Sequence, residues 1–154
     1  MTHSAAQPGW IAALAIVLLG SLAGCGTPAS SAAEKQRLEA ALQGTPAVLA
    51  LRPDNSLGID VPLRSCFDRG RATVKPALAK VLDRMADSQR DETTHILVSA
   101  PAEPGSRTLG LAMQRAVSTR DYLIERGLDP SRFSVSAAPG KPTVKIVIAS
   151  SASP

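Results

Sequence analysis

Two side chains in the sequence, Cys66 and His95, are of types that could act as a nucleophile and its base. Such a pair needs a third group to orient the base, and the sequence offers none. Residues 25–154 hold His95 as their one histidine, which excludes a histidine-rich metal site. Both residues also lie in apolar segments typical of a protein core. The sequence therefore predicts that the protein is not an enzyme, and no metal or cofactor is expected.

The other cysteine of the sequence, Cys25, follows a segment with the composition of an export signal. Residues 1–24 contain no Lys, Arg, Asp or Glu, and residues 10–19 form the apolar run WIAALAIVLL. This run is shorter than the about 20 apolar residues that a transmembrane helix needs. It has the length of the apolar core of a secretory signal. The sequence thus predicts a signal peptide over residues 1–24.

The residues around the predicted cleavage point, Leu-Ala-Gly-Cys at 22–25, resemble the lipobox of bacterial lipoproteins. The resemblance implies cleavage before Cys25 and transfer of acyl chains to its thiol, and two or more chains anchor a protein stably. Gly26 in place of Asp favours the outer membrane by the same resemblance. An ordinary signal peptide, or an uncleaved anchor with a coincidental cysteine, is the alternative interpretation.

Composition after residue 24 limits the kinds of partner. The net charge is +4 with both signs interspersed, which is too mild to indicate nucleic acid binding. Phe67, Tyr122 and Phe133 are the aromatic residues of this part, too few for a platform that stacks bases or sugars. With Cys25 acylated, Cys66 has no intramolecular disulfide partner. It is expected to be a small buried apolar residue, with an intermolecular disulfide as the alternative.

The first elements after Cys25 are predicted from turn residues and periodicity. Residues 26–33 (GTPASSAA) are small and polar, which predicts a flexible linker, and residues 34–43 have the spacing of a short helix. Two apolar runs, 47–51 and 57–63, flank a Pro-Asp-Asn turn and predict a β-hairpin, with Pro62 at a strand end.

The remaining pattern predicts alternating helices and strands. Apolar residues at helical spacing predict helices over 76–88 and 106–126, and apolar runs predict strands over 94–100, 133–138 and 143–149. The expected buried face of the second helix consists of Leu109, Ala112, Met113, Ala116, Leu123 and Ile124. From residue 57 the order is β-α-β-α-β-β, which predicts an α/β sandwich with helices packed on a mixed sheet.

This order and several local motifs resemble the OmpA-like domain, a family that includes the peptidoglycan-associated lipoproteins. Residues 61–72 (VPLRSCFDRGRA) resemble the family's opening, in which a strand leads to Phe, Gly and Ala before a Pro-led helix, here started by Lys75-Pro76. Residues 111–116 (LAMQRA) resemble its helix pattern ending in Arg-Ala. The resemblance spans about residues 57–149 and implies two main helices packed on a mixed sheet.

The resemblance also implies a ligand site. In the family, an Asp after the second strand and the Arg of the Arg-Ala pair bind diaminopimelate of the cell-wall peptide, since a carboxylate pairs with its ammonium and a guanidinium with its carboxylate. The Arg corresponds to Arg115. Counted from the strand, the acidic position falls on Glu103; counted back from Gly105, it falls on Ala102. The resemblance thus implies either Glu103 as the carboxylate or a pocket without one.

The predicted organisation is a lipoprotein signal peptide over 1–24, a lipid-anchored linker with a short helix over 25–45, and an OmpA-like domain over 46–150. The predicted function is an outer-membrane lipoprotein whose domain faces the periplasm and binds the peptide stem of peptidoglycan non-covalently through Glu103 and Arg115.

Two alternatives accompany this prediction. The domain could be a protein-interaction module of an envelope complex with a degenerate pocket. Arg115 could also be a surface residue, or a partner of Asp121 or Glu103 in an ion pair.

Overall fold

The computed structural model describes residues 28–103, 105, 109–138 and 140–149, with the backbone alone for residues 28–30. The predicted signal peptide and the predicted lipidation site at Cys25 lie outside the described residues. Among the residues described, no helix combines the length and the apolar character needed to cross a membrane.

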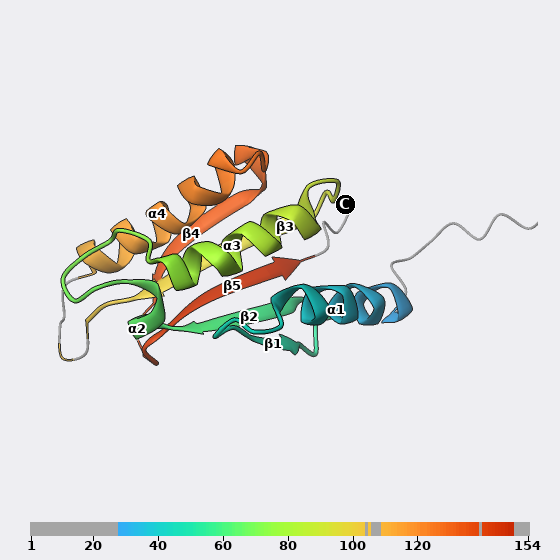
Figure 1. Ribbon diagram of the computed structural model, residues 1–154, viewed down its shortest axis with the longest axis horizontal. Coiled ribbons are helices and arrows are strands. Elements are labelled where there is room, and N and C mark those ends of the chain that lie inside the picture. Colours follow the sequence, from blue (N-terminus) through green and yellow to red (C-terminus); the bar gives the residue numbers. More distant parts are fainter. Residues whose placement is uncertain (1–27, 104, 106–108, 139, 150–154) are drawn as a thin grey trace, which may run out of the picture.

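The centre of the fold is a five-stranded mixed sheet with the strand order β1-β2-β5-β3-β4 (Figure 1). Its strands are β1 (Val48–Leu51), β2 (Leu57–Pro62), β3 (His95–Pro101), β4 (Phe133–Ala138) and β5 (Thr143–Ala149). The pair β3 and β4 is parallel, and every other neighbouring pair is antiparallel. The predicted β1–β2 hairpin is confirmed, and Pro62 lies at the end of β2, where the lack of an N–H disturbs the ladder least.

Three helices cover one face of this sheet (Figure 1). They are α1 (Pro28–Leu42), α3 (Pro76–Gln89) and α4 (Gly110–Glu125). Helix α3 lies between the other two, α1 packs on β1, and α4 packs on β3 and β4. A short helix, α2 (Leu63–Cys66), and a 3-10 turn, η1 (Pro130–Arg132), complete the described elements. The predicted α/β sandwich with helices on a mixed sheet is confirmed.

The core lies between the sheet and the helices because alternate residues of a strand point to the same face. Each of the three inner strands contributes three buried apolar side chains to this face: Leu57, Ile59 and Val61 from β2, Ile96, Val98 and Ala100 from β3, and Val144, Ile146 and Ile148 from β5. Helix α3 meets them with Leu78, Val81, Leu82 and Met85, the stripe that its periodicity predicts.

Helix α1 begins at Pro28, six residues before the predicted start at residue 34. The prediction of a flexible linker was therefore wrong for residues 28–33. Proline fits the first turn of a helix, where its missing N–H has no partner to lose, and the alanines that follow favour helical backbone. The helix is held on the domain by Leu38 and Leu42, which are 0% and 5% exposed.

Helix α4 begins at Gly110, and residues 106–108 of the predicted helix lie outside the described residues. The predicted burial was wrong for two residues, since Leu109 is 48% and Met113 is 40% exposed. The side chains buried along α4 are Ala112, Arg115, Ala116, Thr119 and Leu123. The small alanines allow the helix to approach the sheet closely, and the helix is turned so that Arg115 points inward.

Candidate functional site

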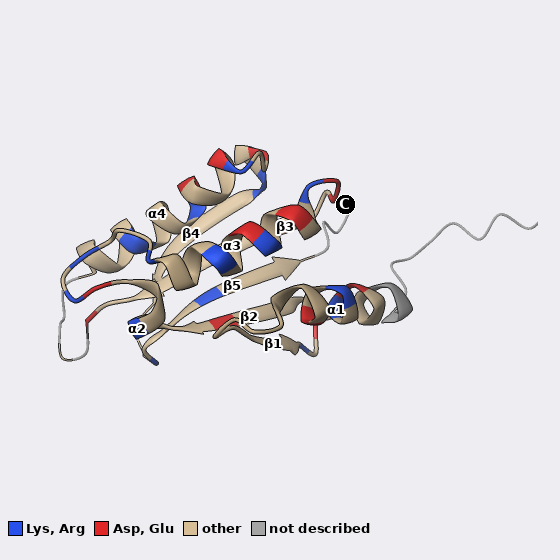
Figure 2. Ribbon diagram, viewed as in Figure 1, with Lys and Arg blue, Asp and Glu red and all other residues tan. Residues whose placement is uncertain are grey.

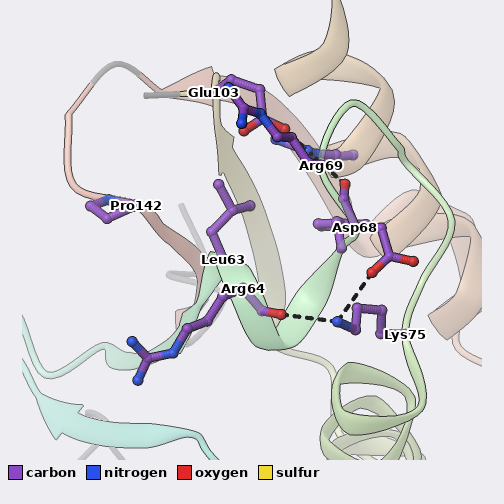
Figure 3. A pocket seen from close by; sticks show the side chains of 9 residues that line it. Leu63, Arg64, Asp68, Arg69, Lys75, Glu103 and Pro142 are labelled. Atoms are coloured by element: carbon purple, nitrogen blue, oxygen red, sulfur yellow. Dashed lines mark hydrogen bonds and ion pairs between the residues drawn. The ribbon is translucent and has the colours of Figure 1, made fainter. Parts of the chain in front are cut away.

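A solvent-open pocket of about 580 Å³ lies where α2, the loop after it, and the carboxyl end of β3 meet (Figure 3). Its lining combines apolar and charged side chains: Leu63, Arg64, Phe67, Asp68, Arg69, Lys75, Glu103, Arg115 and Pro142. The charged residues of this end of the molecule include both signs, close together along the loop between α2 and α3 (Figure 2). Such a lining can bind a ligand that has separate positive and negative groups, because each group can pair with a side chain of opposite charge.

Arg115 forms the back of the pocket and is 1% exposed. Its Nε donates to the carbonyl of Arg71 at 2.9 Å, and its Nη2 donates to the carbonyl of Asp68 at 3.3 Å. Its Nη1 contacts the carbonyl of Pro101 at 3.5 Å, and its guanidinium carbon lies 5.4 Å from the centre of the Phe67 ring. Burial of a guanidinium is tolerated here because carbonyl oxygens replace the water that it loses.

Glu103 is the carboxylate partner of Arg115. Its Oε1 accepts from Nη2 of Arg115 at 2.5 Å and from the backbone N–H of Gly70 at 2.9 Å. These two contacts, the N–H of Gly70 first and then the guanidinium, hold the pKa of the Glu103 carboxyl below its ordinary range. Its side chain remains 23% exposed, so the carboxylate is ionised, held in place and accessible from the pocket.

The loop over residues 67–75 brings backbone groups to both partners. Phe67 is 3% exposed and fixes one end of the loop in the core, while the N–H of Lys75 donates to the carbonyl of Cys66 at 2.9 Å at the other end. Gly70 has a positive φ of 69°, in the left-handed region that favours glycine. This turn directs the N–H of Gly70 toward Glu103 while neighbouring carbonyls face Arg115.

The remaining charged residues of the pocket differ in whether they have partners. Lys75 Nζ lies 3.2 Å from Asp68 Oδ1 and donates to the carbonyl of Arg64 at 3.2 Å. The guanidinium groups of Arg64 and Arg69 make no ion pair or hydrogen bond with any residue that the structure describes, and both residues are exposed. Among the described residues, the pocket therefore presents two cations without an ion-pair partner.

The structure brings together the two residues predicted from the resemblance, Glu103 and Arg115, in one ion pair. The acidic residue after β3 that lines the pocket is Glu103. The ion pair of Arg115 is with Glu103, whereas Asp121 pairs with Arg120 at 2.6 Å. Sequence reasoning missed Arg64, Arg69 and Lys75 as pocket residues. The signal for them was the cation-rich stretch around the Phe67 motif.

Cys66 and His95 are not arranged for catalysis. Cys66 is buried, its Sγ contacts the carbonyls of Val61 and Pro62, and burial raises the pKa of its thiol to about 12. His95 is exposed and shares a hydrogen bond with Ser134 at 2.9 Å, so its predicted core position was wrong. Within the described part of the chain, no cluster of three or more His, Cys, Asp or Glu side chains is placed to hold a metal ion.

Comparison with known families agrees with this fold. The sequence matches the OmpA family over residues 66–146, just over half of the chain, and the chain belongs to this family. The protein therefore carries an OmpA-like domain of the peptidoglycan-binding type, from a non-enzymatic family of the bacterial cell envelope whose domains face the periplasm. No curated protein sequence matches the chain significantly.

Solved structures with the same fold come from several bacteria. A putative MotB-like protein from Desulfovibrio vulgaris matches with a TM-score of 0.68 and 13% identity, over 81% of this chain and 94% of that one. The cell wall anchor of the T6SS from Pseudomonas aeruginosa matches with a TM-score of 0.63 and 17% identity, over 75% and 95%. The periplasmic domain of Helicobacter pylori MotB matches with a TM-score of 0.55 and 21% identity, over 71% and 83%. At these identities the likeness shows the fold.

Proposed function

We propose that this protein is an exported, lipid-anchored protein of the outer membrane whose OmpA-like domain binds the peptide stem of peptidoglycan non-covalently. The observation that carries the proposal is the Glu103 carboxylate, which is ionised, rigidly held and accessible in a mixed-charge pocket. Diaminopimelate of the cell-wall peptide has an ammonium group at the end of its side chain. A carboxylate in this position is the matching acceptor.

In the proposed site Glu103 takes the place of the family's Asp as a longer carboxylate, and the surroundings of Glu103 support this role. A glutamate side chain has more rotamer freedom than an aspartate. Two hydrogen bonds to one carboxylate oxygen, from Gly70 and from Arg115, remove that freedom before any ligand arrives. Because these hydrogen bonds already order the Glu103 side chain in the free protein, ligand binding does not have to supply the entropy cost of ordering it.

The arrangement of the whole domain is compatible with an anchor at Cys25. The start of α1 and the helix α2, which contributes Leu63 to the pocket lining, lie at opposite ends of the long axis of the molecule (Figure 1). A membrane anchor three residues before Pro28 would therefore leave the pocket on the side of the domain away from the lipid. Peptidoglycan is the polymer that faces an outer-membrane protein on that side. We accordingly propose that acylation of Cys25 and binding of peptidoglycan together connect the outer membrane to the cell wall.

The test is sedimentation with purified sacculi, using the full-length protein extracted from membranes in mild detergent. Wild type is expected to sediment, and Glu103→Gln is expected to lose roughly tenfold or more in affinity, since a hydrogen bond to a charged group contributes about 1.5–3 kcal/mol. Glu125→Gln is the matched control, because Glu125 is an exposed carboxylate at the far end of α4.

Two outcomes would contradict the proposal. Wild type remaining in the supernatant would show that the pocket does not bind the cell wall, and would favour a protein-interaction module of an envelope complex. Equal sedimentation of wild type and Glu103→Gln would remove Glu103 from the binding site.

A further inference from the structure

We infer that the carboxylates of the ligand are bound by the exposed guanidinium groups of Arg69 and Arg64, and that Arg115 is a positioning residue that holds Glu103. This inference rests on the proposed binding of peptidoglycan and adds the residues that recognise the negative charges of the stem peptide. It assigns carboxylate recognition to residues outside the pair predicted from the sequence.

The first argument is that the donors of Arg115 are already used. A guanidinium has five N–H groups. In Arg115 one N–H is taken by the carbonyl of Arg71, two at Nη2 by Asp68 and Glu103, and one at Nη1 by the carbonyl of Pro101. One N–H is left, whereas bidentate recognition of a carboxylate needs two parallel donors. A ligand carboxylate would have to displace Glu103 or a buried carbonyl to pair with Arg115.

The second argument is the balance of charge in the pocket. Its lining has four cations, Arg64, Arg69, Lys75 and Arg115, and two carboxylates. Both carboxylates already have a cation, Asp68 with Lys75 and Glu103 with Arg115. Within the described residues, Arg64 and Arg69 are the lining cations without such a partner. The pocket therefore favours a ligand with more carboxylates than ammonium groups.

The third argument is the position of the two free cations relative to Glu103. Figure 3 shows Arg69 beside Glu103, and the charge of Arg69 acts on the Glu103 carboxyl. The terminal ammonium and carboxylate of diaminopimelate are bonded to the same carbon atom, so they require a carboxylate and a cation close together. Glu103 and Arg69 meet this requirement.

Arg64 is placed to bind a second carboxylate of the same ligand. It lies on the other side of Leu63 from Glu103, with its guanidinium directed away from Glu103 (Figure 3). Leu63 and Pro142 form an apolar surface between these two ends, which suits the methylene groups of a peptide side chain. A second carboxylate, farther along the stem peptide, would meet Arg64.

The experiment compares two probes on the full-length protein in detergent, by calorimetry or by NMR titration. Free diaminopimelate carries two zwitterionic ends, and the tripeptide Ala-γ-Glu-diaminopimelate adds the α-carboxylate of its γ-linked glutamate along the stem. Arg69→Ala is expected to weaken both probes about tenfold, and Arg64→Ala to weaken the tripeptide about tenfold while changing diaminopimelate less than twofold. Lys80→Ala is the control, because Lys80 is an exposed cation of α3 that does not line the pocket.

A second comparison uses the tripeptide with its carboxylates converted to amides. Wild type is expected to bind it more weakly than the free acid, and the double variant Arg64→Ala, Arg69→Ala is expected to lose this preference. The inference is overturned if either single variant binds the tripeptide within twofold of wild type, or if the double variant keeps the preference for free carboxylates. Wild type that binds neither probe nor sacculi overturns the proposed function itself, and the two failures are thereby distinguished.

Discussion

At the scale of single residues, the ion pair between Glu103 and Arg115 combines a structural and a functional part. Arg115 is 1% exposed and joins the helix α4 to carbonyls of the loop after α2, while Glu103 is 23% exposed at the pocket surface. Removing one member of a buried pair leaves the other without compensation, which destabilises a protein by about 3–5 kcal/mol. Loss of binding in Arg115→Ala would therefore not separate ligand contact from folding. The isosteric change at Glu103 is the better probe.

The pKa of Glu103 predicts how stability depends on pH. Because the folded protein holds this pKa below its ordinary value of 4.5, the unfolded chain takes up the proton first as the pH falls. The stabilisation is complete above about pH 4.5 and is lost as the pH falls through the folded pKa. Urea unfolding of wild type from pH 7 to pH 3 is expected to show a steeper loss than that of Glu103→Gln.

In that experiment Glu125→Gln is expected to follow the wild-type curve, because Glu125 is exposed. Parallel curves for wild type and Glu103→Gln would mean that the contacts of Glu103 with Gly70 and Arg115 do not favour its ionised form.

Cys66 gives a second prediction at this scale. Its thiol is 0% exposed and has a pKa of about 12, so it is neutral and shielded at pH 7.5, and the thiolate is the reactive form. Native protein is expected to resist N-ethylmaleimide for hours and to react within minutes in urea, followed by mass spectrometry. The control is Thr73→Cys in a Cys66→Ser background, which places a thiol at an exposed site of the nearby loop. Rapid labelling of Cys66 in the native wild type would contradict its buried position.

At the scale of elements, the loop over residues 67–75 supplies the backbone groups that hold Glu103 and Arg115 in the pocket. Its ends are fixed by Phe67 in the core and by the N-terminus of α3, and between them the turn at Gly70 supplies an N–H to Glu103. The helix α4 supplies Arg115 to the same loop from the other side. Neither element forms the site alone, and the loop depends on left-handed backbone at one residue.

Gly70→Ala tests this dependence. An added Cβ at Gly70 meets no atom within 4 Å, so the effect comes from the positive φ of 69° alone. A loss of about 1 kcal/mol in the free energy of unfolding is expected. Binding to sacculi is expected to weaken as well, because relaxation of the turn moves the N–H away from Glu103.

Gly44→Ala is the matched control for this change. Gly44 has a φ of 72°, has no atom within 4 Å of an added Cβ, and lies after α1, outside the pocket. The two variants are expected to lose similar stability, measured by urea unfolding, while Gly44→Ala binds sacculi like wild type. Equal binding by both variants would show that the Gly70 turn does not position Glu103.

At the scale of the whole molecule, the extension of α1 to Pro28 shortens the proposed tether. Three residue steps separate Cys25 from Pro28, which span at most about 11 Å. The helix itself is about 22 Å long and is docked on the domain through Leu38 and Leu42. An acylated Cys25 would thus hold the domain close to the membrane with its pocket directed away. Confinement to this layer raises the effective concentration of the site at the cell wall.

Cys25→Ala separates the anchor from the pocket. In cells, the variant is expected to leave the membrane fraction, and the fraction cross-linked to peptidoglycan is expected to fall several-fold because the effective concentration is lost. The purified variant is expected to bind the tripeptide with wild-type affinity, since the substitution leaves every described lining residue of the pocket unchanged. A variant that stays in the membrane fraction would show that the protein is held there by something other than acylation of Cys25.

Local patterns in the sequence predicted most of the fold because they depend on neighbouring residues. The alternation of apolar residues in the strands and their helical spacing in α3 specify which side chains are buried, without knowledge of the elements that pack against them. The Arg-Ala motif and the acidic residue after β3 likewise identified Arg115 and Glu103 by position along the chain. The face of α4 was predicted less well. Its apolar residues Leu109 and Met113 are exposed, because Arg115 occupies the inward position that periodicity alone assigns to an apolar side chain.

The sequence by itself determined the order of elements and the core positions of the strands, and it predicted Glu103 and Arg115 as the site residues. Tertiary structure alone decided that Arg115 is buried and paired, and that Arg64 and Arg69 line the same pocket without an ion pair to any described residue. The physical reason is the distance along the chain between the partners. Arg115 is satisfied by carbonyls 44 and 47 residues away, and such contacts exist only after the loop at Gly70 and the helix α4 have packed together.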